Sequence, residues 1–584
     1  MRFSRSRSTV AVDPSDLRRA LRAFAPALGG QRLRIATTML LALAVSGLEI
    51  LKPWPITWVI DALTVPASAT GAAVDPGPVS LAPIVAFAAL ALAIPALLGV
   101  AMERLDLGVA QVSRKATVRI RSDVFEHIQR LELSQHQQHY SGDLIVRLMG
   151  DVNMIRDLLF PSWVNVVSRG SVLIGGSIVF AMVDWRLFAV ALIPLPLLWV
   201  SLERTSSAVK SAAGKSRRKE GAIASTAAES IRQVGLIKAF AAEGRTSDAF
   251  RSNARSAERA TMAAARHSAR MVRLTEILTG GGVALVLVMG ATRVRAGLLT
   301  PGELVLALSY TSMIYKPIRK LTGEGARIAK ATACALRVLD LLEQPIEDSV
   351  TGQPVATLDG DIEFINVGHA YHDGRASLTD FSAHISAGLL TAIIGENGTG
   401  KSTLLSLLLR LHRPTAGEIR IGGTPVEELQ LGGYREQIAY VPQELALFGG
   451  TIRDNIAFGQ PSATDEAIHA AASAALLTPV LEQLPDGIDT LLDEDGSSLS
   501  GGQARRVMLA RAAVRDASIL VLDEPLTGLD PDARDTVARA IKNIAAGRTT
   551  LVIHHGDLDE LDPDACLRLS HRPRPQPHLE AVYR

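Results

Sequence analysis

The chain has 584 residues, a formal net charge of +2 at pH 7 and two cysteines, and 48% of its residues are hydrophobic. The length suggests three or four average domains, or fewer if one is large, and the near-neutral charge with no basic-aromatic array gives no support for a nucleic-acid partner. Two cysteines without a Cys-x-x-Cys pair exclude a disulfide framework and the usual zinc sites, while the high hydrophobic fraction points to membrane segments.

An amphipathic helix is predicted ahead of the first apolar segment, in the stretch "DPSDLRRALRAFAPALGG". Four apolar residues share one face of this helix: Leu17, Ala20, Leu21 and Phe24. Arginines occupy the other faces, an arrangement suited to the inner surface of a membrane. A solvated helix of a soluble region is the alternative.

Six segments are apolar over about the 20 residues that cross a bilayer. They are residues 35–60, 81–102, 163–183, 185–202, 274–292 and 298–315. The buried helices of a large soluble core are the alternative, but the flanking charges are sorted: the N-terminal arm and both long connections are rich in Arg and Lys, and the first short connection has none. The positive-inside rule then places the N-terminus and the C-terminal half in the cytoplasm. We expect an integral multi-pass protein of a bacterial inner membrane.

Charged residues inside predicted spans are functional candidates by default. Glu49 and Lys52 lie one turn apart in the first span, and Arg169 lies in the third. Facing a central cavity, they would suit an amphipathic or zwitterionic substrate. Pairing within the bundle, or reaching to the membrane surface, is the alternative.

The two long connections, 103–160 and 203–273, keep helical periodicity with few Gly or Pro residues. They are therefore predicted to continue membrane helices into the cytoplasm. Each is interrupted by a polar, turn-prone patch, "SQHQQHYSGD" at 134–143 and "AAEGRTSD" at 241–248. These patches are predicted to be the tips of helical hairpins, placed to touch the domain that follows.

The character of the sequence changes after Lys330. A connecting helix and the linker-like stretch "EQPIEDSVTGQPVATLDG" lead to short apolar strands that alternate with helices, the pattern of an α/β domain. Four regions are thus expected: an arm with the amphipathic helix at 1–34, a transmembrane domain at 35–330, a connecting helix and linker at 331–360, and an α/β domain at 361–584.

The stretch "LTAIIGENGTGKSTLLSLLLRL" reads as a strand, a glycine-rich turn and a helix, and it contains the phosphate-binding pattern GxxxxGK[ST]. Backbone amides of 396–402 would cradle phosphates, Lys401 would reach the terminal phosphates and Ser402 would hold Mg²⁺. The predicted nucleotide-binding residues of this loop are Gly395, Asn397, Gly398, Thr399, Gly400, Lys401, Ser402 and Thr403.

A second strand, in "ASILVLDEP", ends in two carboxylates. Asp523 fits a second Mg²⁺ position, and Glu524 is placed to polarise a water molecule near the terminal phosphate. An acidic pair after a strand is common and alone carries little weight. The upstream phosphate loop makes the nucleotide interpretation the stronger one.

A glycine pair, Gly501 and Gly502, lies in "LLDEDGSSLSGGQARR" at the start of another predicted helix. Backbone N–H groups at a helix start favour an anion such as phosphate. The chain therefore has two loops suited to phosphate about a hundred residues apart.

Taken together, these motifs resemble one family over essentially the whole chain: half-transporters of the ATP-binding cassette (ABC) exporter class. "SLSGGQ" at 498–503 is similar to the family's signature loop, "VPQELALF" supplies the loop glutamine Gln443, and "LTGLD" supplies the loop aspartate Asp530. "LVIHHGD" places His555 at the switch histidine, with His554 where Thr or Ser is usual, and Tyr371 matches the adenine-stacking aromatic.

The resemblance implies a six-helix transmembrane α bundle with long cytoplasmic extensions, followed by an α/β P-loop ATPase domain, with ATP and Mg²⁺ as cofactors. It implies catalytic roles for Glu524, His555 and Gln443 and metal ligation by Ser402, Gln443 and Asp523. In this family two chains stack head to tail, and the signature loop of one holds the ATP bound by the other. The signature residues, Ser500, Gly501, Gly502 and Gln503, would therefore serve the partner's nucleotide.

The implied function is ATP-driven export through an alternating-access dimer in the lipid bilayer, with an unknown small or amphipathic substrate. A homodimer is preferred because every nucleotide motif is intact. The run 492–496 differs from the family's usual sequence before the signature, and the C-terminal tail is short, so a heterodimer is the alternative. An importer with the exporter fold, for a siderophore for example, and a membrane-tethered ATPase that regulates a partner also remain open.

Overall fold

The computed structural model describes residues 13–64, 81–138, 141–371, 376–493, 498–555 and 558–570. It divides into two compact units. The helical unit comprises Met1–Glu126 and Gly142–Glu343, and the sheet unit comprises His127–Ser141 and Gln344–Arg584. The tip of the first long connection therefore clusters with the sheet unit. Each unit is described by itself below.

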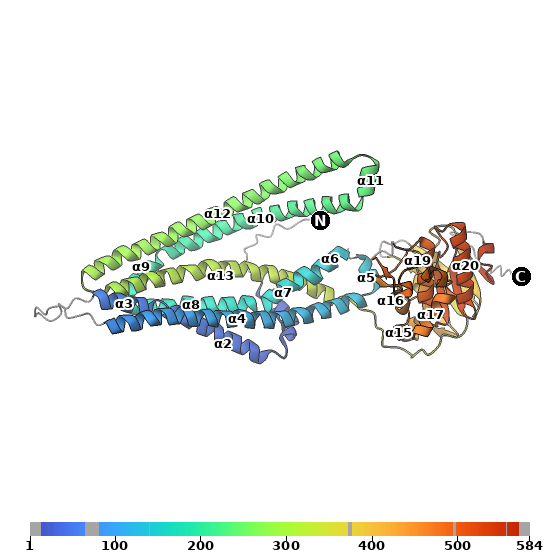
Figure 1. Cartoon of the computed structure of the whole chain (residues 1–584), viewed down its shortest axis with the longest axis horizontal. Helices are drawn as coiled ribbons and strands as arrows, with labels where there is room; N and C mark the ends of the chain where they lie inside the picture. The colour runs from blue at the N-terminus through green and yellow to red at the C-terminus, as the bar shows by residue number, and fades with distance from the viewer. Residues whose placement is uncertain are drawn as a thin grey trace, which may run out of the picture. The chain divides into compact units, whose positions relative to one another are not determined.

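Long helices form the helical unit (Figure 1). In chain order its elements are α1 (Pro14–Phe24), η1 (Ala25–Leu28), α2 (Arg32–Leu51), α3 (Trp54–Thr64), α4 (Leu81–Arg130), α6 (Ser141–Val146), η2 (Arg147–Asp151), α7 (Val152–Leu159), α8 (Pro161–Val183), α9 (Trp185–Leu192), α10 (Pro194–Arg232), α11 (Val234–Ala239), α12 (Glu243–Arg295) and α13 (Pro301–Leu342). The predicted amphipathic helix is α1, and its Ala20 and Phe24 are buried.

All six predicted spans are helical, but proline divides two of them. The first is split between α2 and α3 at Pro53, and the fourth between α9 and α10 ahead of Pro194, because proline lacks the N–H that would continue the helix. Four stretches of the described chain are long and apolar enough to cross a membrane: Arg32–Thr64, Ala82–Arg130, Gly142–Val183 and Glu243–Arg295. A shorter apolar helix covers Trp185–Ser201. The last predicted span begins α13.

Buried tyrosines join the helices of this unit. The Tyr310 hydroxyl donates to the Ile50 carbonyl at 2.7 Å and accepts from the Trp54 indole at 2.9 Å, so α13 is fixed to the α2–α3 break. The Tyr315 hydroxyl donates to the Ala191 carbonyl at 2.7 Å, which fixes α13 to α9. These bonds also satisfy polar groups that would otherwise be unpaired in an apolar core.

The polar residues predicted in the spans have different surroundings. Glu324 of α13 is buried, and its Oε1 lies 4.0 Å from Arg169 and accepts from Asn165 at 3.3 Å. Arg169 is thus paired within the bundle. Glu49 and Lys52 form no ion pair with each other in the described part of the chain.

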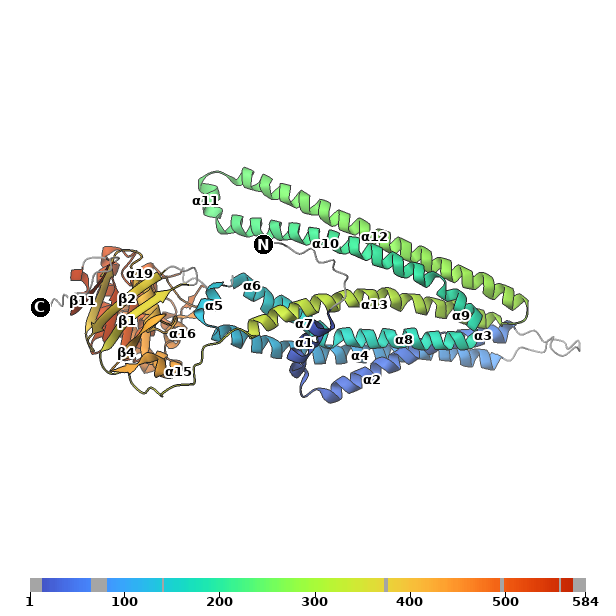
Figure 2. The ribbon, with the colours of Figure 1, turned by 180° about the vertical axis from the view of Figure 1, so that it is seen from behind.

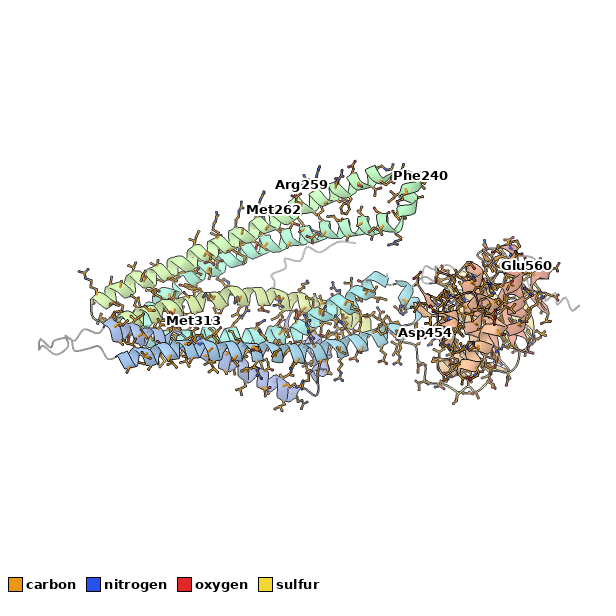
Figure 3. All side chains as sticks on the ribbon, viewed as in Figure 1. Phe240, Arg259, Met262, Met313, Asp454 and Glu560 are labelled. Atoms are coloured by element: carbon orange, nitrogen blue, oxygen red, sulfur yellow. The ribbon has the colours of Figure 1, made fainter. Side chains whose placement is uncertain are left out.

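The second long connection forms a helical hairpin of α10 and α12, closed by α11 (Figures 1 and 2). The hydroxyls of Ser216 and Thr261 lie 2.7 Å apart between the two long helices. The prediction of the tip at 241–248 was displaced: α11 occupies 234–239, and residues 243–248 already belong to α12. Polar character is compatible with a helix start, which explains the error. Arg259 and Met262 are exposed on α12 (Figure 3).

The sheet unit contains a parallel sheet in the order β11-β3-β10-β9-β6 and an antiparallel sheet in the order β2-β1-β4-β5. Figure 2 labels β11 of the first sheet and β1, β2 and β4 of the second. The strands are β1 (Ile362–Ala370), β2 (Ala376–Ile385), β3 (Leu390–Gly395), β4 (Ala416–Ile421), β5 (Thr424–Pro425), β6 (Ile438–Val441), β7 (Gly450–Thr451), β8 (Leu491–Leu492), β9 (Ile519–Asp523), β10 (Thr549–Ile553) and β11 (Ala565–Leu569). β7 pairs with β8 in a separate ribbon.

The sheet unit also contains helices, and its strands β9 and β10 are buried along their whole length, as expected for the centre of a parallel sheet. The helices are α5 (Leu133–Gln138), α14 (Lys401–Leu408), η3 (Val426–Glu428), α15 (Leu431–Glu436), α16 (Ile452–Ala457), α17 (Asp465–Ala474), α18 (Thr478–Leu481), η4 (Gly487–Asp489), α19 (Gly501–Ala513), α20 (Pro531–Ala545) and η5 (Leu558–Glu560). The departure at 492–496 and the C-terminal tail fall mostly outside the described residues.

Candidate nucleotide site

Four neighbouring strands of the parallel sheet each lead into one predicted motif. β3, β10, β9 and β6 lie side by side in that order, and all pairs are parallel. Their carboxyl ends therefore meet at one edge, the usual place for a ligand in such sheets. The residues that follow the strands are the glycine-rich loop, His555, Glu524 and Gln443.

The glycine-rich loop has backbone geometry that favours glycine. Gly398 has φ of 81° and Gly400 has φ of 95°, in the region that L-residues rarely adopt. A Cβ at Gly400 would also lie 2.7 Å from the Ser377 carbonyl oxygen. The chain can thus turn sharply from β3 into α14, whose first N–H groups face an anion-binding position. Asn397 and Ser402 are exposed beside it.

Lys401 is the buried cation of this loop. Its ammonium donates to the carbonyl oxygens of Gly395 and Glu396, both at 2.8 Å, so the lysine is folded over the turn. Burial lowers the pKa of Lys401, whereas Glu524 and Asp523 act in the opposite direction. Thr399 supports the turn by donating its hydroxyl to the Glu396 carbonyl at 2.9 Å.

Glu524 is held by three side chains. Its Oε2 accepts from the Gln443 amide at 2.8 Å and from the Thr527 hydroxyl at 3.1 Å, and its Oε1 lies 2.9 Å from His555 Nε2. Its φ of 45° is unusual for a residue other than glycine. Such strain costs about 1–3 kcal/mol and concentrates at functional sites.

Asp523 precedes it at the end of β9 and is buried, with no partner for its Oδ1. Burial, reinforced by Glu524, raises the pKa of Asp523. A buried carboxylate oxygen without a donor fits a cation, and oxygen donors are those that Mg²⁺ prefers. Among the described residues, no group of three His, Cys, Asp or Glu side chains could hold a metal alone. Other oxygen ligands, such as Ser402 and Gln443, would be required.

Tyr371 follows β1 and lies beside the start of α14. Its hydroxyl is 3.0 Å from the Thr403 hydroxyl, which is also 2.6 Å from that of Ser377. The Tyr371 ring packs at right angles to His369, with centroids 5.0 Å apart. A cavity of about 510 Å³ in the sheet unit is lined by Tyr371 and also by Glu132 and Ser134 of the first long connection. Tyr371 therefore shares this cavity with residues of the first long connection.

The signature residues form their own local structure at the start of α19. Ser500 is the N-cap: its hydroxyl accepts from the Gln503 N–H at 3.3 Å, and its N–H donates to the Gln503 side chain at 2.9 Å. A Cβ at Gly502 would lie 2.8 Å from the Ala533 Cβ, so only glycine fits against α20. Asp530 caps α20 by accepting from the Ala533 N–H at 2.8 Å.

Two residues of this site were missed from the sequence. Arg505 is buried and donates to the carbonyl oxygens of Pro442 and Gln443, both at 2.8 Å, so it links α19 to the loop of Gln443. Thr527 contributes the third contact to Glu524. Arg505 could have been found from the sequence, because it is an arginine on an otherwise apolar face of a predicted helix. Thr527 could not, because its contact with Glu524 depends on a turn that the sequence alone does not specify.

Two family models match the chain. The "ABC transporter transmembrane region" covers residues 35–318, and "ABC transporter" covers residues 378–527. A relative from Chromohalobacter salexigens is 30% identical over 448 residues, which are 76% of this chain and 77% of the relative, and is named an ATP-dependent lipid A-core flippase. A Syntrophus aciditrophicus relative of the same name is 30% identical, covering 76% of this chain and 74% of its own length.

A Bacillus subtilis relative, the uncharacterized ABC transporter ATP-binding protein YwjA, is 29% identical and covers 75% of this chain and 76% of its own length. Among solved structures, a bacterial Atm1-family ABC exporter with ATP bound has a TM-score of 0.77 and covers 92% of this chain and 94% of that chain. The identity of 24% makes this a likeness of fold.

The chain belongs to the ABC transporter family. It is an integral membrane protein with an exporter-type helical region followed by an ATP-binding domain, and it works as an ATP-hydrolysing exporter. The fold class and general function expected from the sequence are thus confirmed. The roles of individual site residues remain predictions.

Proposed function

We propose that two identical copies of this chain bind two ATP molecules, each between the glycine-rich loop of one copy and the signature loop of the other. The observation that carries the proposal is the arrangement at the carboxyl edge of the parallel sheet, where Lys401, Asp523 and Glu524 of one chain lie together. The Ser500 cap is exposed and bonded to Gln503, which leaves it presented outward for a second copy.

Mg²⁺ would be held by Ser402, Asp523 and Gln443, and it would neutralise charge on the phosphates. Glu524 would orient and polarise the attacking water, and His555, Gln443 and Thr527 would hold its carboxylate in place. Tyr371 would stack on adenine. Asp530 would shape the loop beside the signature, because it caps α20.

Closure of the two copies would reach the membrane through the hairpin tips. Residues of the first tip already line the cavity next to Tyr371. The second tip, α11 with Phe240, presents exposed apolar side chains suited to a partner surface. We place the N-terminal arm (1–34), the connecting segment (331–360) and the ATPase domain (361–584) in the bacterial cytoplasm and the six spans of 35–330 in the inner membrane.

The substrate we infer is amphipathic and charged. Arg169 and Arg327 both approach the buried Glu324 between α8 and α13, and Arg327 also pairs with Asp157, which gives the bundle a polar cluster. Several relatives are named lipid A-core flippases, which supports a lipid-like substrate. Vesicle-based transport of labelled anionic lipids, compared with neutral lipids, tests this class.

Complementation tests the shared sites. Lys401→Ala and Ser500→Arg chains, each inactive alone, are co-expressed with different tags, and the mixed dimer is isolated and reconstituted in lipid. If sites are shared, one of its two sites has an intact loop from each chain, so ATPase activity should return to a level clearly above that of either single variant. Failure of an assembled mixed dimer to recover activity, while a wild-type mixed dimer is active, would contradict shared sites. A wild-type chain without ATPase activity when it is the only chain present would point to a heterodimer.

A further inference from the structure

The end of β10 carries two successive histidines with different surroundings. His555 contacts Glu524, whereas His554 is buried, with 5% of its surface exposed. Successive side chains of an extended segment point to opposite sides, which separates the two rings. His554 Nε2 lies 3.9 Å from Glu560 Oε2.

Glu560 also contacts the helix that follows the aspartate loop. Its Oε1 accepts from Arg534 of α20 at 3.2 Å (Figure 3 labels Glu560). Arg534 in turn donates to the Leu529 carbonyl at 3.3 Å, within the loop that ends at Asp530. Its Nε is buried without a partner, so its fixed contacts are made through the two terminal nitrogens.

This loop and α20 form the surface on which the signature loop rests. A Cβ on Gly501 would be 3.8 Å from a Leu529 methyl carbon, and one on Gly502 would be 2.8 Å from the Ala533 Cβ. Ala533 is the neighbour of Arg534 in the sequence. A continuous set of contacts therefore runs from His554 through Glu560 and Arg534 to the signature loop.

We propose that Glu560 is a positioning residue that links the catalytic histidine of one ATP site to the loops that serve the other. This rests on the proposed function, in which His555 acts on the chain's own ATP while the signature loop binds the partner's. Displacing His555 on hydrolysis would shift His554, and Glu560 would pass that shift to Arg534 and the aspartate loop. The two sites of a dimer would then act cooperatively.

Glu560→Gln is the informative variant, because it keeps the shape of the side chain and removes its charge. We expect kcat for ATP hydrolysis to fall about tenfold, since small misplacements of catalytic groups are costly. KM for ATP should stay within about twofold of the wild type, and the Hill coefficient for ATP should fall toward 1. Arg534→Gln should behave alike, and the double variant should be no worse than either single one.

Glu418→Gln is the matched control: Glu418 is a partly exposed acid of the same unit, paired with Arg420 outside this set of contacts. It should leave kcat and the Hill coefficient unchanged. A Glu560→Gln enzyme with wild-type kcat and Hill coefficient would overturn the proposal. A variant that loses affinity for ATP would also overturn it, because Glu560 would then act by stabilising the fold of the site. Unchanged turnover in Glu524→Gln would instead contradict the proposed function.

Discussion

The Glu524 carboxylate is held in one orientation by its neighbours and by its own backbone. The carboxylate is fixed by a glutamine from the β6 end, a histidine from the β10 end and a threonine of its own turn, and its backbone adopts a left-handed conformation. These contacts fix the direction of the two carboxylate oxygens, and a group that polarises a water molecule needs such a fixed direction. The neighbouring Asp523, by contrast, lacks a donor on Oδ1 and is suited to a cation.

Glu524→Gln should abolish turnover without abolishing nucleotide binding. The amide keeps the size of the side chain but cannot accept a proton, and loss of a general base costs about 10² to 10⁴ in rate. ATPase assays in lipid, together with a fluorescent-nucleotide titration, measure the two effects separately. Residual turnover above a tenth of the wild type would show that another group is the base.

Asp523 should make Mg²⁺ use depend on pH. Its pKa is raised by burial and by Glu524, so its carboxyl stays protonated to higher pH than an ordinary aspartate. A cation needs the ionised form, and its affinity should therefore fall as pH falls. We expect the free Mg²⁺ concentration for half-maximal ATPase to rise as the pH is lowered. The fully exposed Asp516, replaced by Asn, provides a control with the wild-type profile.

Arg505→Ala should weaken both stability and catalysis. It removes two charge-assisted hydrogen bonds and leaves the carbonyl groups of Pro442 and Gln443 without their partner, at a cost of about 2–4 kcal/mol. Thermal unfolding with and without ATP, and ATPase activity, provide the readouts. Arg539→Ala, at an exposed position of α20, should change neither. Equal melting temperatures for both variants would refute a linking role of Arg505.

At the scale of elements, the signature loop depends on its fit against α20. Ser500 caps α19, Asp530 caps α20, and the two helix starts meet at Gly502 and Ala533. Neither cap can move alone, because close packing leaves no space between them. The position of the loop that we assign to the partner's ATP is therefore determined by α20.

Gly502→Ala tests this fit. The added methyl group would lie 2.8 Å from the Ala533 Cβ, so one helix start must shift by several tenths of an ångström. We expect ATPase activity to fall by at least tenfold while the protein remains folded, since overpacking costs about 1–3 kcal/mol. Gly244→Ala, where no atom lies within 4 Å, is the control. A second change, Ala533→Gly, should restore part of the activity by making room for the methyl.

Much of the nucleotide site could be predicted from the sequence, because four of its motifs directly follow apolar strands. Local patterns specified the strand before Lys401, the one before Asp523 and the helix after Gly502. Contacts between distant segments could not be read in this way. The bonds from Arg505 to Gln443 and from Arg534 to Glu560 join residues 62 and 26 positions apart, and they depend on how α19 and α20 pack. The hairpin tip was misplaced because polar residues suit both turns and helix starts.

At the scale of the whole molecule, the chain combines a helical unit with an ATP-binding unit, and the first long connection contributes its tip to the latter. The Leu131–Ile346 bridge and the Glu347 N–H bond to the Arg130 carbonyl, 2.7 Å long, attach this tip to the start of the ATP-binding unit. The end of α4 thus belongs to the ATP-binding unit. Closure of two chains around ATP is the movement that we expect to drive transport.

Spin labels at position 516 can follow closure. In a background with both native cysteines replaced by serine, Asp516→Cys places a label on the surface of the ATP-binding unit. In the Glu524→Gln variant, ATP should shift the distance distribution between the two labels, since the closed state persists without hydrolysis. Adding Ser500→Arg should prevent the shift. A shift that survives this change would mean that closure does not require the signature loop.

The folded-over ammonium of Lys401 has a consequence for how long a nucleotide stays bound. Its two acceptors, the Gly395 and Glu396 carbonyls, belong to the same loop that receives the phosphates. A phosphate group must compete with them for the lysine, so binding exchanges one set of partners for another and gains only the difference. When the terminal phosphate is cleaved, the carbonyls are again within reach of the ammonium. We expect this internal competitor to speed the departure of the product after each cycle.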